Sequence, residues 1–126
     1  MAKTLGFVGI ESYDVMLTLT ALLKELGLSV ALQDLSYDNS IPGLNDCDGS
    51  KVCEWHDCLV ADGEYDFPET DYLLIYFGRN LNNTDQCDEI YAVTDQQKHN
   101  IEFLKQLELN GDQYPVVIYR HFQTKI

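Results

Sequence analysis

The strongest constraint on the fold is a pattern near the start of the chain: a short apolar run, an amphipathic segment and a second apolar run. Residues 4–9 (TLGFVG) are apolar and end in glycine, which predicts a buried strand. Residues 29–35 (SVALQDL) predict a second strand. A strand, a helix of about four turns and another strand form a βαβ unit, whose strands are parallel and whose crossover is right-handed.

The segment between these two runs predicts an amphipathic helix. Ser12 suits the N-cap, Asp14 suits the first turn, and Gly27 suits the residue just after the helix. The apolar positions form a stripe that we expect to pack on a sheet: Val15, Leu19, Leu22 and Leu26, widened by Met16 and Leu23.

Later apolar runs predict further strands at 72–77 (YLLIYF), 89–93 (EIYAV) and 115–119 (PVVIY), with a shorter candidate at 57–61 (DCLVA). Between the predicted strands at 89–93 and 115–119, Thr94 and Gln97 have the spacing of a capping box and predict the start of a second helix. Its apolar stripe is expected to comprise Ile101, Leu104 and Leu107.

These elements predict an α/β fold, a single domain spanning 1–126, with a mostly parallel sheet of about five strands and flanking helices in three layers. Two helices can hardly cover both faces of such a sheet. We therefore expect a face or edge to be covered by something else: the segment 38–71, a second copy, or a further C-terminal part.

The charge of the chain excludes several partners. Lys and Arg number 8 against 21 Asp and Glu, and a net charge of −13 argues against nucleic acid and against anionic membrane surfaces. No apolar run is long enough to span a membrane, and residues 5–10 are too short for a secretory signal, so a cytoplasmic location is expected. The segment 38–71 carries −9 of the charge, and it is either a solubilising loop or a surface for a basic partner.

The turn after the first predicted strand is where open α/β sheets bind ligands. A phosphate-binding loop needs several glycines, a lysine and a Ser or Thr for Mg²⁺. Residues 8–14 (VGIESYD) contain one glycine, Gly9, no lysine, and the acids Glu11 and Asp14. Each acid within ~4 Å of a phosphate would cost about 4 kcal/mol at an effective dielectric of ~20, so nucleotide binding is not expected.

Four stretches of the sequence nevertheless resemble a known family. They are GFVGIESYDVMLTLTALLKELG, LSVALQDLS, YDFPETDYLLIYFG and CDEIYAVTDQQKHNIEFLKQL, and together they cover roughly residues 3–38 and 65–120. In order and spacing they resemble the MinD/ParA branch of P-loop ATPases, and more narrowly the atypical pilus-assembly localisation proteins of the TadZ/CpaE type. The resemblance implies a P-loop NTPase-like fold.

The departures from that family argue against its ATPase activity. Asp34 matches the family's strand-terminal Asp, but Ser12 stands at the phosphate-loop lysine, Tyr13 at the following Ser/Thr, and Tyr76 at the Asp that holds the Mg²⁺ water. Phosphoryl transfer depends on electrostatic positioning, which this set of residues does not supply. Gly9, Ser12 and Asp34 are therefore interpreted as a vestigial nucleotide site, and no cofactor is expected.

A zinc site is a separate alternative. Cys53, His56 and Cys58 are closely spaced, with Cys47 or Cys87 as a possible fourth ligand. In a cytosolic protein, reduced thiols are the usual state of such cysteines.

The resulting hypothesis is a catalytically inactive domain that acts through a protein partner or a homodimer in localisation, scaffolding or regulation, with a pilus or secretion assembly as one candidate setting. The expected interface is Tyr13, Tyr76, Arg79 and the loop 78–83, where the related ATPases dimerise across nucleotide. The alternatives are an atypical nucleotide-binding ATPase or sensor that retains Asp34, and a small zinc-stabilised module.

Overall fold

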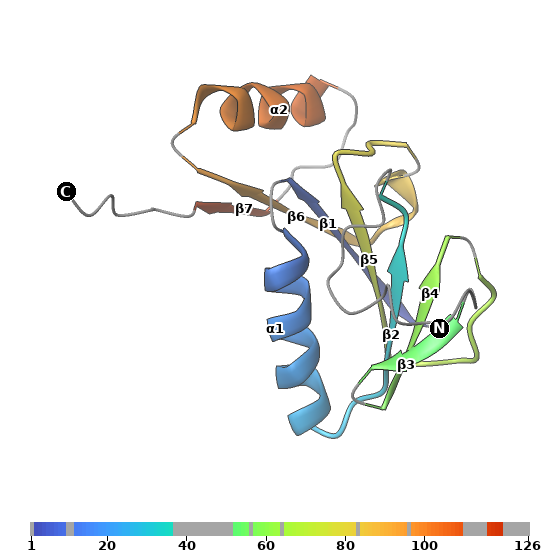
Figure 1. Ribbon diagram of the computed structural model, residues 1–126. Coiled ribbons are helices and arrows are strands. Elements are labelled where there is room, and N and C mark those ends of the chain that lie inside the picture. Colours follow the sequence, from blue (N-terminus) through green and yellow to red (C-terminus); the bar gives the residue numbers. More distant parts are fainter. Residues whose placement is uncertain are drawn as a thin grey trace.

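A computed structural model of the chain describes residues 2–9, 12–36, 52–55, 57–63, 65–82, 84–95, 97–109 and 116–119 (Figure 1). The helices are α1 (Ser12–Glu25) and α2 (Lys98–Leu109), with a short 3-10 helix, η2 (Thr84–Gln86). The strands are β1 (Lys3–Gly9), β2 (Val30–Asp34), β3 (Val52–Trp55), β4 (Cys58–Asp62), β5 (Tyr72–Gly78), β6 (Glu89–Thr94) and β7 (Val116–Tyr119).

The strands form one sheet in the order β3-β4-β2-β5-β1-β6-β7. Six of them are parallel, and β3 pairs antiparallel with β4 at one edge. The predicted α/β class and parallel sheet are confirmed, as is the short strand predicted at 57–61. The sheet has seven strands where about five were predicted, because the candidate at 57–61 is a strand as well and β3 was not recognised.

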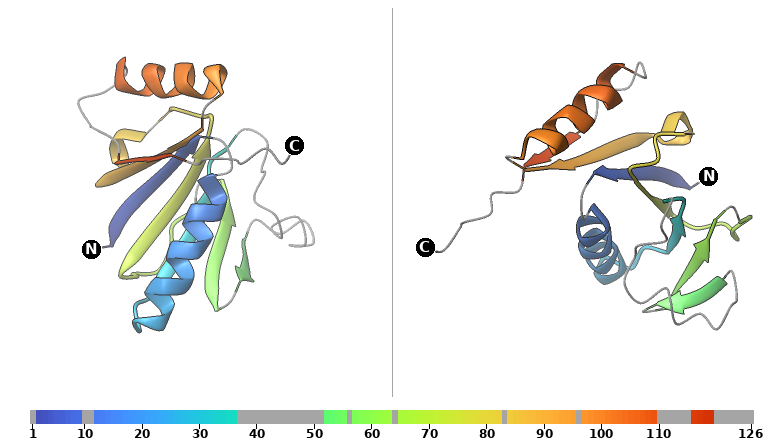
Figure 2. Two further views of the ribbon diagram at one scale, coloured as in Figure 1. Left: turned by 90° about the vertical axis from the view of Figure 1, so that its left-hand side faces the viewer. Right: turned by 45° about the horizontal axis from the view of Figure 1, so that its top comes forward.

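The two helices lie on opposite sides of this sheet, which gives a three-layer arrangement (Figure 2). Helix α1 packs against β5, β1 and β2, and α2 packs against β6 and β1. Each side has its own apolar core, one centred on Phe7 and Leu74 below α1 and the other on Val8, Ile75 and Phe77 below α2. Because neighbouring residues of a strand point to opposite faces, Phe7 and Val8 serve different cores.

Helix α1 ends as the sequence predicts. Gly27 has a φ of +80°, and the amides of Gly27 and Leu28 donate to the carbonyls of Lys24 and Leu23. This pair of bonds is the Schellman arrangement, in which a glycine in the left-handed region completes the helix.

The face that α1 turns to the sheet differs from the prediction. The buried line runs through Ser12, Met16, Thr20 and Leu23. Leu22 is 54% exposed and Leu26, just beyond the helix, is 75% exposed. Met16 and Leu23 are buried as predicted, but the prediction that Leu22 and Leu26 pack on the sheet was wrong. The helix turns the side that also carries Ser12 and Thr20 to the sheet, which leaves the other edge of the stripe exposed.

Helix α2 also begins differently. Thr94 is the last residue of β6, and the helix begins at Lys98, so Thr94 is not its cap. The neighbouring Asp95 accepts a hydrogen bond from the Gln97 amide instead. Of the predicted stripe, Ile101 is exposed, and the side chains of Leu104 and Leu107 lie outside the described part.

In the part of the chain that the structure describes, no helix combines the length and apolar character needed to cross a membrane.

Candidate functional site

Parallel strands end at the same edge of a sheet, so β1, β2, β5 and β6 bring their carboxyl ends together. This edge holds the three residues predicted as a vestigial nucleotide site. Gly9 ends β1, Ser12 begins α1, and Asp34 ends β2.

Gly9 is in very close contact with β6. Its φ is +101°, and a Cβ placed on it would lie 2.1 Å from the carbonyl oxygen of Val93. The Ser12 hydroxyl is fully buried and donates to the carbonyl oxygen of Gly9 at 3.1 Å. Both residues are therefore engaged in holding the end of β1. Ile10 and Glu11, between them, lie outside the described residues.

Asp34 is buried at the end of β2 and organises the turn that follows. Its Oδ1 accepts hydrogen bonds from the Ser36 amide at 2.9 Å and from the Ser36 hydroxyl at 2.5 Å. Its main-chain carbonyl accepts from the amide of Gly63 at 2.8 Å, which ties the end of β2 to the end of β4. These bonds give Asp34 a structural role at the position where the resemblance implies a nucleotide site.

The predicted interface residues are not brought together as one surface. Tyr76 is 4% exposed and belongs to the core below α1, where its ring meets that of half-buried Tyr13 edge-on at a centroid distance of 6.0 Å. Arg79 instead contacts α2 on the other side of the sheet. Its guanidinium lies 5.4 Å from the centroid of the Phe103 ring.

A polar chain that the sequence analysis did not single out links Arg79 to the end of β6. The Arg79 guanidinium donates to Asn100 Oδ1 at 3.1 Å, and Asn100 Nδ2 donates to Asp95 Oδ1 at 2.7 Å. Both Asp95 and Asn100 are buried. The hydrogen bond from Asn100 is the main reason that the pKa of Asp95 lies below its ordinary value, with a further contribution from the Gln97 amide. The local sequence pattern around Asp95 gave no signal of this polar chain.

The predicted zinc ligands can be followed only in part. His56 and the side chain of Cys53 lie outside the described residues. Cys58 is buried in the core below α1, and burial is the main reason that its pKa is raised. Within the described ranges, no three His, Cys, Asp or Glu side chains are grouped so that they could hold a metal ion.

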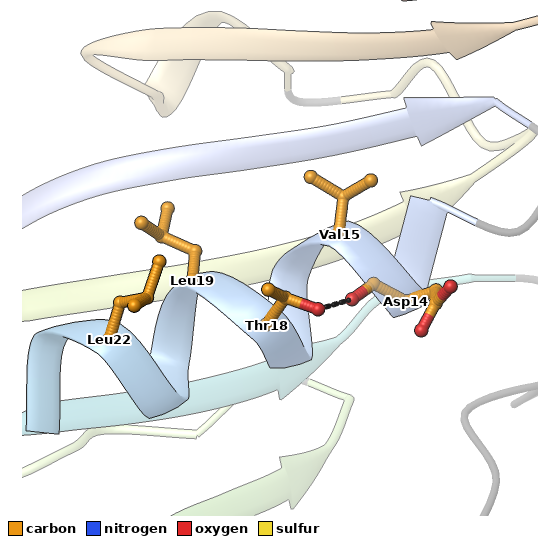
Figure 3. Close-up of a pocket in the computed structure, with 5 residues that line it drawn as sticks. All are labelled: Asp14, Val15, Thr18, Leu19 and Leu22. Atoms are coloured by element: carbon orange, nitrogen blue, oxygen red, sulfur yellow. Dashed lines mark hydrogen bonds between the residues drawn. The ribbon is translucent and has the colours of Figure 1, made fainter. Parts of the chain in front are cut away.

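A further feature, which was not predicted, lies on the side of α1. A pocket of about 300 Å³ runs along this side of the helix. It is lined by Asp14, Val15, Thr18, Leu19 and Leu22, a surface that we call the α1 flank. Figure 3 shows Val15, Leu19 and Leu22 projecting on the side of α1 where β1 and β6 lie, with Thr18 donating to the Asp14 carbonyl at 2.9 Å.

The α1 flank contains Val15, Leu19 and Leu22 of the apolar stripe predicted from the sequence, whereas Met16 and Leu23 of that stripe are buried in the core. Val15 and Leu19 are partly buried against the core, whereas Leu22 is largely exposed. An apolar groove with one carboxylate at its end can bind apolar side chains, and it offers no arrangement of acid, base and nucleophile for catalysis.

No family model, curated protein sequence or solved structure matches this chain.

Proposed function

We propose that this chain is a non-catalytic α/β domain that works by binding another protein, and that the α1 flank is its binding surface. The observation that carries the proposal is the exposure of Leu22 beside a pocket lined by Val15 and Leu19. Apolar surface that is contiguous and grooved is typical of interaction sites, whereas single exposed apolar residues are ordinary.

The residues at the edge where β1, β2, β5 and β6 end are already engaged with one another, and this supports the non-catalytic part of the proposal. Ser12 is hydrogen-bonded to Gly9, Asp34 is hydrogen-bonded to Ser36, and Tyr76 is packed in the core. Among the described residues at this edge, the cation is Arg79, and it is engaged with Asn100 and Phe103. A triphosphate would need cations and open amides here.

A first experiment tests nucleotide binding directly. Isothermal titration calorimetry with ATP and ADP, with and without Mg²⁺, is expected to show no binding tighter than ~100 µM. Tighter binding that depends on Asp34, tested with Asp34→Asn, would replace this proposal by the atypical nucleotide-binding alternative.

A second experiment tests the surface in the native cell. A photoreactive benzoylphenylalanine is placed at Leu22, and as a control at Gln106, which is exposed on α2 at the other side of the sheet. Cross-linking at position 22 but not at position 106 is expected. Equal adducts at both positions, or none at position 22, would contradict the proposal.

The finer parts of the hypothesis remain predictions from the sequence. A pilus or secretion assembly as the setting, a cytoplasmic location, and a homodimer through Tyr13, Tyr76 and Arg79 all belong to this class. The burial of Tyr76 favours the α1 flank over that tyrosine as the contact surface.

A further inference from the structure

We infer that the occupant of the α1 flank is a basic amphipathic helix of a different protein. This inference rests on the proposed function and specifies the chemistry of the partner. Three observations lead to it: the uneven cover of the sheet, the helical spacing of the groove, and the sign of the charge around it.

The α1 side of the sheet is covered unevenly. Helix α1 packs over β5, β1 and β2, and α2 lies on the opposite side (Figure 2). Among the described elements, no helix lies beside α1 over β6 and β7. On this face Tyr91 stacks on Phe7 with ring centroids 5.4 Å apart, and its register partner Val116 is 48% exposed. At the start of β6, Glu89 accepts a hydrogen bond from the Tyr91 hydroxyl and pairs with Lys3 at 3.7 Å, so the charges at that end of the face are balanced. Because register partners share a face, Val116 extends this surface on the α1 side.

The dimensions of the groove suit a helix. Val15, Leu19 and Leu22 lie at spacings of four and three, and Leu26 continues the line by four. At 1.5 Å per residue, this line is roughly 16 Å long, about three helical turns. A helix packing here would bury its own residues at i, i+3 or i+4, and i+7 between the leucines, as in the helix-in-groove mode of recognition.

The charge selects the sign of the partner. Among the described residues that line the pocket, Asp14 is the charged one, and the whole chain carries −13. Lys24, the cation of α1, lies near Cys58 of β4 and therefore on the other side of the helix. A second copy would bring two chains of −13 together with their Asp14 residues at the contact. A helix with Lys or Arg beside its apolar stripe meets complementary charge instead.

The test uses the full chain and three fluorescent peptides of about 18 residues. The first has leucines at helical spacing with lysines elsewhere, the second replaces the lysines by glutamates, and the third has the composition of the first in a scrambled order. Binding is followed by fluorescence anisotropy. The first peptide is expected to bind with a Kd below about 100 µM, at least about tenfold tighter than either of the others. Its affinity should fall about tenfold when NaCl rises from 50 to 500 mM.

Two variants locate the binding. Leu22→Gln removes apolar surface from the groove and is expected to weaken binding about tenfold. Ala21→Gln introduces the same side chain at the neighbouring position, which is exposed and does not line the pocket, and should leave the Kd unchanged. Equal urea midpoints of both variants and the wild type show that the fold is retained.

Several results would overturn the inference. They are equal binding of the lysine peptide and its scrambled form, tighter binding of the glutamate peptide, or no effect of Leu22→Gln. Sedimentation that shows a dimer of the wild type, lost in Leu22→Gln, would assign the groove to a second copy. If position 22 cross-links in cells while the lysine peptide fails, the proposed function stands and the basic helix is wrong. If both fail, the proposed function fails as well.

Discussion

The close approach of β1 to β6 leads to a quantitative prediction about Gly9. Replacing this glycine by alanine adds a Cβ that would lie 2.1 Å from the Val93 carbonyl oxygen and 3.2 Å from the Val93 amide nitrogen. The same change puts an L side chain on a residue with a φ of +101°. Forcing a non-glycine residue into such a conformation costs about 1–3 kcal/mol. Pushing two packed strands apart costs about 1–3 kcal/mol more.

Gly27 provides the matched control. Its φ is +80°, but a Cβ there would have no atom within 4 Å. Gly27→Ala therefore carries the conformational cost without the collision, and we expect it to lose about 1–2 kcal/mol. Gly9→Ala should lose about 4 kcal/mol, a large part of the total for a domain that is stable by roughly 5–15 kcal/mol.

Urea unfolding followed by far-UV circular dichroism measures both losses, and unchanged slopes with urea would show that the unfolded states are comparable. A Gly9→Ala protein that is already unfolded in water agrees with the prediction, provided that Gly27→Ala folds. Equal losses for the two variants would refute the reasoning, because they would mean that β1 and β6 separate at no cost.

Two further predictions concern titratable groups. The pKa of Asp95 is lowered in the folded protein, so its contribution to stability is present above the ordinary Asp value of 3.8 and is lost as the pH falls through the folded pKa. The urea midpoint of Asp95→Asn should therefore decrease less between pH 5 and pH 2 than that of the wild type. The same decrease in both proteins would contradict the prediction. Burial raises the pKa of Cys87 from 9.0 to about 12. At pH 8, alkylation of Cys87 by iodoacetamide, followed by peptide mass spectrometry, should be about a thousandfold slower in the native protein than in urea, and similar rates would contradict the burial of the thiol.

The parallel sheet could be predicted because its central strands are continuous apolar runs. Residues 72–77 have no polar alternation, and in the structure β5 lies between β2 and β1 with both faces covered. Strand β3 could not be predicted on this basis. It is four residues long, contains exposed Glu54, and depends on antiparallel pairing with β4. Such a strand is defined by its neighbour rather than by its own composition.

The candidate site was predictable only where it depends on topology. The expectation that Gly9, Ser12 and Asp34 share one edge follows from parallel strands, and the structure places them there. The chain from Arg79 through Asn100 to Asp95 depends on side-chain hydrogen bonds between strand ends and a helix. Arg79 and Asn100 are 21 residues apart in the sequence, and Asn100 and Asp95 are 5 apart. Nothing in the local pattern distinguishes Asp95 from an ordinary linker acid.

The orientation of α1 shows why hydropathy alone did not place the buried face of this helix correctly. Two lines of residues on this helix compete for the sheet, and the one with fewer apolar residues is buried. Its two hydroxyls find partners within the helix region, since Thr20 donates to the Met16 carbonyl at 2.8 Å and Ser12 donates to that of Gly9. A hydroxyl bonded in this way costs little to bury, so the helix can turn Met16 and Leu23 to the core. That choice leaves Leu22 and Leu26 outside. Their exposure is thus a consequence of how the buried face is satisfied, and a partner that covers them would recover apolar burial that the fold itself leaves unused.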